Sequence, residues 1–236
     1  MSQQISATAV QSEISLQVPP LEAGDHLTRC EFERRYEARP DLKKAELIEG
    51  VVYMPSPVRI KGHGRPHGKI MTWLGTYVAT TPGVDLADNT TVRLDFDNEP
   101  QPDALLRLEP GVGGRSSVSE DDYLEGAPEL IVEVAASSAS YDLHEKLRAY
   151  RRNGVQEYVV WRVYDQQIDW FQLLDGEYVP LMPDVDGIIH SRVFPGLCLA
   201  VSAMLAGDLA TVLSELQKGI GSPEHAAFVE RLQGKA

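Results

Sequence analysis

The chain has 236 residues, of which 43% are hydrophobic and 24% charged, and this composition suits one globular domain with short extensions. Its net charge of −13 and its pI near 4.9 argue against a general affinity for nucleic acids, because such binding depends mainly on neutralising phosphates. An acidic protein can still carry a local basic patch, so these numbers lower the expectation of DNA binding without removing it.

Signals for targeting and redox chemistry are absent from the sequence. The N-terminus has no basic segment followed by an apolar one, and no apolar run approaches the roughly 18 residues of a membrane span. The two cysteines, Cys30 and Cys198, match no zinc or redox spacing and are expected to be reduced. We therefore expect a cytoplasmic protein without a membrane partner.

The first half of the chain predicts alternating short elements. The polar residues 1–27 form an N-terminal extension, and residues 28–39 have helical character. Residues 45–57 alternate as a strand, and residues 60–68 form a glycine-rich turn. A helix is expected over residues 69–80, because a Pro-Gly pair follows it.

The second half is richer in strands. Residues 84–110 predict two or three strands, residues 129–138 one, and residues 156–181 two or three more. Between them, Asp142 and Glu145 have the spacing of a capping box for a helix over residues 142–152.

The order of these elements predicts a mixed α+β fold, with a central mixed sheet of four or five strands flanked by helices. We expect one main domain over residues 28–200 and an amphipathic helical extension over residues 201–236.

A carboxylate interrupts the apolar strand ELIVEVAASS. Leu130, Val132 and Val134 would line one face of the strand, and Ile131 and Ala135 would share the other face with Glu133. Neither face is polar enough to lie in solvent. A buried carboxylate is costly unless a cation or hydrogen-bond donors accompany it, so Glu133 is expected to have such partners.

Two further polar residues flank this strand in the sequence. Asp103 opens an apolar strand in QPDALLRL, and Lys146 borders the apolar stripe of the following helix. Two carboxylates on neighbouring strands are a suitable site for Mg²⁺ or Mn²⁺, and an adjacent amine can position water. Taken singly, Asp103 also fits a turn residue, Glu133 a structural ion pair and Lys146 a solvated lysine.

These motifs resemble a known family. QPD, the ELIVEVAASS strand, KLRAYRRNGVQEYVVW and AELIEGVVYMPSP are similar to the Uma2-type family of "putative restriction endonucleases", within the PD-(D/E)XK nuclease superfamily. The similarity covers roughly residues 28–200. It implies a PD-(D/E)XK nuclease-like core and the Mg²⁺-dependent hydrolysis of DNA, with Asp103 and Glu133 as metal ligands and catalytic residues.

The superfamily signature is altered in this chain. The superfamily usually has lysine two residues after the acid, where this chain has Ala135, so the resemblance makes Lys146 the substitute. It also implies a further acid from the N-terminal region, which is Glu46 or the nearby Glu49. His67 matches a histidine often found at the start of the family's next helix, and a packing role and a site role stay open for it.

Basic residues follow Lys146 on the same helix, where Arg148 and Arg151 could bind DNA phosphates or simply be solvated. The leading hypothesis is a metal-dependent DNA endonuclease, as a homodimer. The alternatives are an inactive nuclease-fold scaffold, which the acidic pI favours, and a hydrolase of small phosphoesters.

Overall fold

A mixed six-stranded sheet forms the centre of the protein. The computed structural model describes residues 18–54, 58–136 and 138–234. The strand order is β11-β10-β9-β8-β5-β3, and only β8 and β9 are parallel. In chain order the six strands are β3 (Val84–Asp88), β5 (Ala104–Leu108), β8 (Leu130–Ala135), β9 (Glu157–Arg162), β10 (Gln167–Leu174) and β11 (Glu177–Pro180).

The predicted mixed sheet is confirmed, but it has six strands rather than four or five. The sheet reaches six because the chain folds back after β10 and adds β11 at the edge. Asp175 and Gly176 form the turn between them, both with positive φ (51° and 83°). An Asp-Gly pair adopts this geometry readily, and it matches the twist of the two strands.

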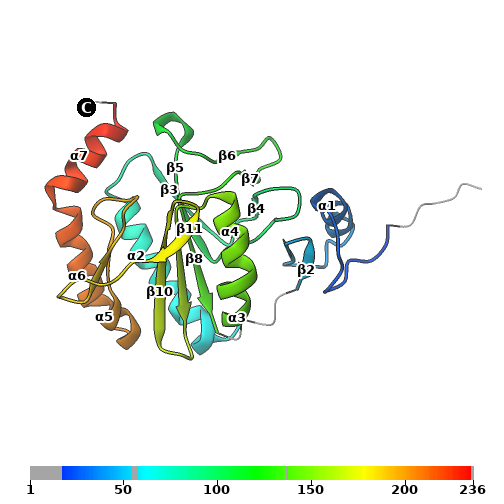
Figure 1. Cartoon of the computed structure of the whole chain (residues 1–236), viewed down its shortest axis with the longest axis horizontal. Coiled ribbons are helices and arrows are strands. Elements are labelled where there is room, and N and C mark those ends of the chain that lie inside the picture. Colours follow the sequence, from blue (N-terminus) through cyan, green and yellow to red (C-terminus); the bar gives the residue numbers. More distant parts are fainter. Residues whose placement is uncertain (1–17, 55–57, 137, 235–236) are drawn as a thin grey trace, which may run out of the picture.

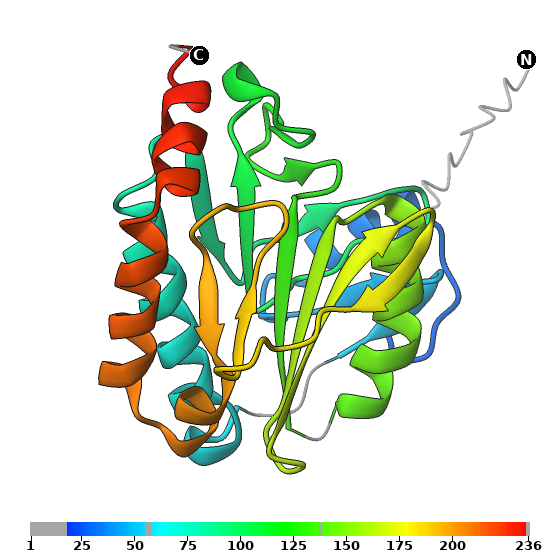
Figure 2. The same ribbon diagram turned by 60° about the vertical axis from the view of Figure 1, so that its left-hand side comes forward.

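Helices cover both faces of the sheet (Figures 1 and 2). One face carries α2 and the C-terminal helices, and the other carries α3, a π-helical turn η3 and α4. Their bounds are α2 (Arg65–Val78), α3 (Ala139–Tyr141), η3 (Asp142–Lys146), α4 (Leu147–Asn153), α5 (Val201–Ala206), α6 (Leu209–Ile220) and α7 (Pro223–Leu232).

The alternation along β8 determines which side chains meet which layer. Leu130, Val132 and Val134 belong to the core that contains residues of α2, α6 and α7. Ile131 and Ala135 belong to the second core, beneath α4. All six side chains of β8 are buried, as the two apolar faces of the sequence predicted. Glu133, which shares a face with Ile131 and Ala135, therefore points toward the layer that carries α4.

The N-terminal segment forms a small unit with its own apolar cluster. It consists of helix α1 (Arg29–Glu37) and a hairpin of β1 (Glu46–Ile48) and β2 (Val51–Tyr53). The prediction of a single strand over residues 45–57 is wrong, because Glu49 and Gly50 turn the chain with positive φ. Residues 55–57 lie outside the described residues.

The helix before β3 begins earlier than the sequence predicted. A π-helical turn η1 (Ile60–Gly64) leads directly into α2, where a glycine-rich turn was expected up to residue 68. Pro66 lies near the junction of η1 and α2, where it cannot donate a helical hydrogen bond back to η1. The capping box is also wrong: the helix begins at Ala139, which leaves Asp142 inside it.

Several minor elements complete the fold. They are β4 (Val92–Arg93), a 3₁₀ turn η2 (Pro110–Val112), β6 (Ser117–Val118), β7 (Leu124–Glu125), β12 (Ile188–His190) and β13 (Cys198–Ala200). A three-stranded sheet has the order β4-β7-β6, and β12 pairs with β13.

None of the helices in the described residues is long and apolar enough to cross a membrane. Cys30 and Cys198 are both free thiols.

Trp73 on α2 provides a test of this architecture. Its side chain is fully buried, lies edge-on to Trp170 at 5.8 Å and donates a hydrogen bond to the Cys198 carbonyl. We expect Trp73→Ala to lower the free energy of unfolding by about 3–5 kcal/mol, because it leaves a cavity. The exposed Thr72→Ala on the same helix should change it by less than about 0.5 kcal/mol. Urea denaturation measures both, and equal effects would contradict this core.

Candidate active site

Strand register brings Asp103 and Glu133 together. Ala104 of β5 pairs with Val132 of β8 in an antiparallel ladder. Asp103, which directly precedes β5, and Glu133 of β8 are therefore both next to this pair, at the same end of it. The Val134 amide donates a hydrogen bond to Oδ2 of Asp103 at 2.7 Å. Both carboxylates are buried, with 5% and 3% of the residue exposed. The expected adjacency of the two strands is therefore present in the structure.

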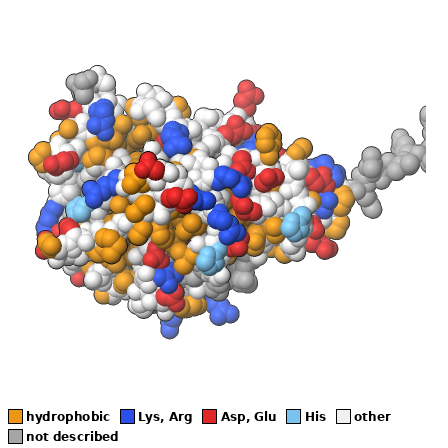
Figure 3. All heavy atoms as spheres, viewed as in Figure 1, with side chains coloured by type: hydrophobic (Ala, Val, Ile, Leu, Met, Phe, Trp, Pro, Cys, Tyr) orange, Lys and Arg blue, Asp and Glu red, His pale blue; other side chains and the backbone are white. Residues whose placement is uncertain are grey.

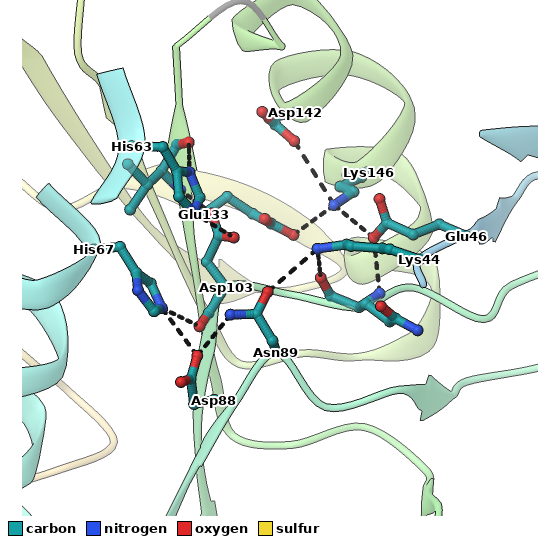
Figure 4. A network of polar contacts seen from close by, with 12 residues as sticks. Lys44, Glu46, His63, His67, Asp88, Asn89, Asp103, Glu133, Asp142 and Lys146 are labelled. Atoms are coloured by element: carbon teal, nitrogen blue, oxygen red, sulfur yellow. Dashed lines mark hydrogen bonds and ion pairs between the residues drawn. The ribbon is translucent and has the colours of Figure 1, made fainter. Parts of the chain in front are cut away.

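Lys146 lies at the centre of an acidic cluster (Figure 4). Its Nζ is 2.8 Å from Oε1 of Glu133 and 2.9 Å from Oε1 of Glu46. A third carboxylate, Asp142, lies one helical turn before it, with Oδ1 3.9 Å from Nζ. The lysine is 3% exposed, so these carboxylates rather than water balance its charge. The amine of Lys146 thus reaches from η3 to Glu133 on the central sheet.

Neutral donors complete the cluster. The Tyr150 hydroxyl donates to Oε1 of Glu133 at 2.8 Å, and the Gln101 amide donates to Oε1 of Glu46 at 2.7 Å. The ring of Tyr141 has its centroid 5.5 Å from Nζ of Lys146, within the range of a cation–π contact. Lys146, Glu133 and Glu46 therefore each have more than one polar or aromatic neighbour that orients them.

Burial and mutual repulsion shift the proton affinities of these groups. Burial raises the pKa of Glu133 to about 8; Lys146 opposes this shift, and Asp103, Asp142 and Glu46 add to it. Burial disfavours the Lys146 ammonium, but the carboxylates outweigh that effect and raise its pKa well above the usual range. Burial also penalises ionised Glu46, yet Lys146 and Lys44 lower its pKa overall. Lys146 and Glu46 therefore form the charged pair, and Glu133 is the acid that binds a proton readily.

The structure separates the two N-terminal candidate acids. Glu46 in β1 contacts Lys146, whereas Glu49 lies at the hairpin turn and pairs with Arg152 at 3.0 Å. The two residues differ because Glu49 occupies the hairpin turn with positive φ, whereas Glu46 lies within β1. Of the two, only Glu46 joins the cluster.

Two histidines lie on the other side of Asp103 (Figure 4). His67 on α2 has Nε2 3.0 Å from the Asp103 carbonyl oxygen and 3.0 Å from Oδ1 of Asp88. His63 in η1 has Nε2 3.4 Å from Oδ1 of Asp103. The rings are stacked, with centroids 5.4 Å apart. His67, a candidate from the sequence, thus contacts the backbone of Asp103 and not its carboxylate.

The candidate DNA-binding arginines lie outside the cluster, on the surface. Arg148 and Arg151 line a shallow pocket of about 370 Å³ together with Glu49 and Glu177. Arg151 pairs with Glu177, and Arg148 lies 3.5 Å from Glu145. Figure 3 shows basic side chains interspersed with acidic ones on the face that carries α4. Local acids therefore partly neutralise this basic surface.

Asp142 and His63 are among the residues of the site that sequence reasoning did not select. The sequence predicts a capping box at Asp142 instead, because an acid three residues before Glu145 has that spacing. His63 lies in a glycine-rich segment that predicts a loop rather than a helical turn. Their common signal is the π-helical turn: η1 carries His63, and η3 carries Asp142 and Lys146. Such turns are frequent at functional sites, but they have no clear sequence signature.

The donor set can be compared with what a divalent cation needs. Within residues 18–54, 58–136 and 138–234, no three His, Cys, Asp or Glu side chains form a ready-made metal cage. Mg²⁺, however, uses one or two carboxylates and keeps several waters. Among the described residues, no hydrogen bond engages Oε2 of Glu133, and Oδ1 of Asp103 faces Nε2 of His63 at 3.4 Å. The donors of Asp103 and Glu133 therefore fit a hydrated hard cation.

The fold is shared with a solved nuclease-like protein. The crystal structure of a "putative nuclease belonging to DUF820" from Anabaena variabilis matches with a TM-score of 0.55 and 14% identity, over 80% of this chain and 99% of the other. This likeness shows that the two chains share a fold. Residues 30–202 match the model of the Uma2 family, described as "Putative restriction endonuclease", so the chain belongs to that family. No curated protein matches the sequence. Family and fold together support a nuclease-like function.

The raised pKa of Glu133 predicts a pH-dependent stability. The folded chain holds this proton more tightly than the unfolded chain, so Glu133 contributes stability below pH 4.5 that is lost as the pH rises toward 8. In Glu133→Gln this loss is absent. We expect its free energy of unfolding, relative to the original chain, to rise by on the order of 1 kcal/mol per pH unit between pH 5 and 8.

Urea denaturation at pH 5, 6.5, 8 and 9 measures this difference. Thr72→Ala changes no titrating group and serves as the control, with an effect that should not depend on pH. A Glu133→Gln difference that stays constant from pH 5 to pH 9 would contradict the assigned environment.

Proposed function

We propose that the protein is a metal-dependent endonuclease that hydrolyses phosphodiester bonds in DNA. Asp103 and Glu133 would bind Mg²⁺ or Mn²⁺. Lys146 would orient the attacking water, and Glu46 would keep the Lys146 ammonium in position. The observation that carries this proposal is the contact of Lys146 with Glu133, at 2.8 Å, on the strand position beside Asp103. This arrangement places the carboxylates of Asp103 and Glu133 and the amine of Lys146 together, in a chain of a family described as "Putative restriction endonuclease".

The residues of the chain have separable tasks in this proposal. The Val134 amide fixes the carboxylate of Asp103, and Lys146 together with Tyr150 fixes that of Glu133. The Lys146 ammonium would orient water and stabilise negative charge that develops on the phosphate. Glu46 keeps that ammonium in place, because its carboxylate is 2.9 Å from Nζ and is itself held by the Gln101 amide.

The cation would supply Lewis-acid chemistry when bound, by lowering the pKa of water and neutralising phosphate charge. Asp103 and Glu133 suit this role by the type of their donors, since hard cations prefer carboxylate oxygens. Lys44 does not compete for these carboxylates, because its Nζ donates to the Gln101 carbonyl and to Asn89.

DNA is the proposed substrate, although the net charge is −13. Arg148 and Arg151 would contact phosphates from the pocket over α4, in competition with the acids beside them. Binding should therefore be weak and strongly dependent on salt. A homodimer would supply the two active sites that a double-strand break needs, and the proposal includes this assembly.

One observation favours a second candidate, an inactive protein that keeps the nuclease fold as a scaffold. Asp103, Glu133 and Lys146 are each no more than 5% exposed, so the cluster could serve as a buried structural ion network. The two candidates differ in one property: a scaffold has no reason to bind a divalent cation at Asp103 and Glu133. A metal titration of the full chain therefore discriminates between them.

Plasmid cleavage with Mg²⁺ or Mn²⁺ tests the proposal. We expect Asp103→Asn, Glu133→Gln and Lys146→Met each to lower the cleavage rate at least about 100-fold, because each removes a group that acts on the reacting atoms. Glu46→Gln and Glu49→Gln form a matched pair. The first should impair cleavage through Lys146, and the second should leave the rate within about threefold.

Thermal denaturation of each variant shows whether it is folded before its rate is interpreted. A wild-type protein that neither cuts DNA nor binds a cation would contradict the proposal and favour the scaffold. Normal cleavage by folded Lys146→Met would contradict only the role of the lysine.

A further inference from the structure

His63 makes two contacts at opposite ends of its ring. Nδ1 is 3.3 Å from the Val134 carbonyl oxygen, and Nε2 is 3.4 Å from Oδ1 of Asp103. The residue is partly accessible, with 21% of its side chain exposed. The ring therefore bridges the C-terminal half of β8 and the carboxylate of Asp103 from the side opposite Lys146 (Figure 4).

The first contact constrains the second. A carbonyl oxygen can only accept, so the hydrogen bond to Val134 requires the proton on Nδ1. In the neutral ring Nε2 then presents a lone pair to Oδ1 of Asp103, which is also an acceptor. Two acceptors facing each other need a positive charge that they share, from either a second ring proton or a metal ion. A histidine that ligates a metal commonly donates its other ring N–H to a backbone carbonyl.

The spacing of the two atoms fits a shared ion. Ligands about 2.1 Å from one ion, at angles of roughly 90–110°, lie about 3.0–3.4 Å apart. Nε2 of His63 and Oδ1 of Asp103 are 3.4 Å apart. This pair supplies two ligands, and waters can complete the shell, so it does not require a cage of three side chains.

The position of His63 is fixed by its surroundings. A Cβ on the preceding Gly62 would lie 3.0 Å from the Tyr164 hydroxyl and 3.3 Å from Cβ of Ala136, so η1 packs closely on the end of β8 at this glycine. The His67 ring stacks against that of His63 and is itself held by Asp88. Close packing on one side and a stacked ring on the other orient the imidazole toward Asp103.

We propose that His63 is a ligand, together with Asp103, of the divalent cation in the active site. This inference rests on the proposed function and narrows the cation. An imidazole nitrogen in the donor set favours Mn²⁺ and the later first-row metals over Mg²⁺, which prefers oxygen ligands. His63 would then make the site bind Mn²⁺ more tightly than Mg²⁺. Mg²⁺ would still bind through the carboxylates, whether or not His63 is present.

Isothermal titration of the full chain with MnCl₂ and with MgCl₂ tests the ligand. We expect His63→Ala to weaken Mn²⁺ binding at least about tenfold and to change Mg²⁺ binding less than threefold. His190→Ala is the matched control, because His190 also pairs with an aspartate (Asp184, 3.0 Å) but lies exposed on β12. It should leave both affinities unchanged.

Electron spin-echo spectroscopy of Mn²⁺ bound to the wild-type chain gives a second readout, which does not depend on the folding of a variant. A nitrogen coupling is expected in the wild type and in His190→Ala, and not in His63→Ala. Mn²⁺ binding without nitrogen coupling, and with equal affinity in His63→Ala, would overturn the assignment of His63 and leave the proposed function intact. A wild-type chain that binds neither cation would overturn both.

Discussion

The structure depends on one buried ammonium group. Lys146 is 3% exposed and lies among the carboxylates of Glu133, Glu46 and Asp142. Removing such charges from water costs several kcal/mol for each ion, and only close opposite charges and fixed donors offset that cost. The cluster therefore ties three separate layers together: the N-terminal hairpin through Glu46, the central sheet through Glu133, and the helical layer through Lys146.

Two local features of the backbone make this arrangement possible. The antiparallel register of β5 and β8 puts Asp103 and Glu133 at neighbouring positions, although they are thirty residues apart in the chain. The π-helical turns η1 and η3 then bring side chains from the two helical layers to this point. Because both turns lie beside β8, the histidines and the lysine reach the acids from opposite sides. A cation held by Asp103 and Glu133 would share Glu133 with Lys146, whose Nζ contacts Oε1 of that carboxylate.

Sequence reasoning could identify the residues whose burial contradicts their charge. Glu133 interrupts an apolar strand, and Lys146 borders an apolar stripe, so both stand out in the pattern. It could not separate Glu46 from Glu49, because that choice depends on a tight turn with positive φ at Glu49. Asp142 was missed because its spacing to the next acid also fits a helix cap, and only the three-dimensional start of the helix excludes that reading. The sequence predicts two or three strands over residues 156–181, but it does not determine how many of them join the central sheet.

The central claim is that Asp103 and Glu133 hold a divalent cation beside Lys146. A crystal structure of the chain soaked in MnCl₂, with data collected to show the anomalous scattering of manganese, tests it most directly. The account predicts an anomalous peak within about 2.3 Å of a carboxylate oxygen of both Asp103 and Glu133, with the Lys146 ammonium nearby. Well-ordered carboxylates with no peak at saturating Mn²⁺, still paired with Lys146, would contradict it.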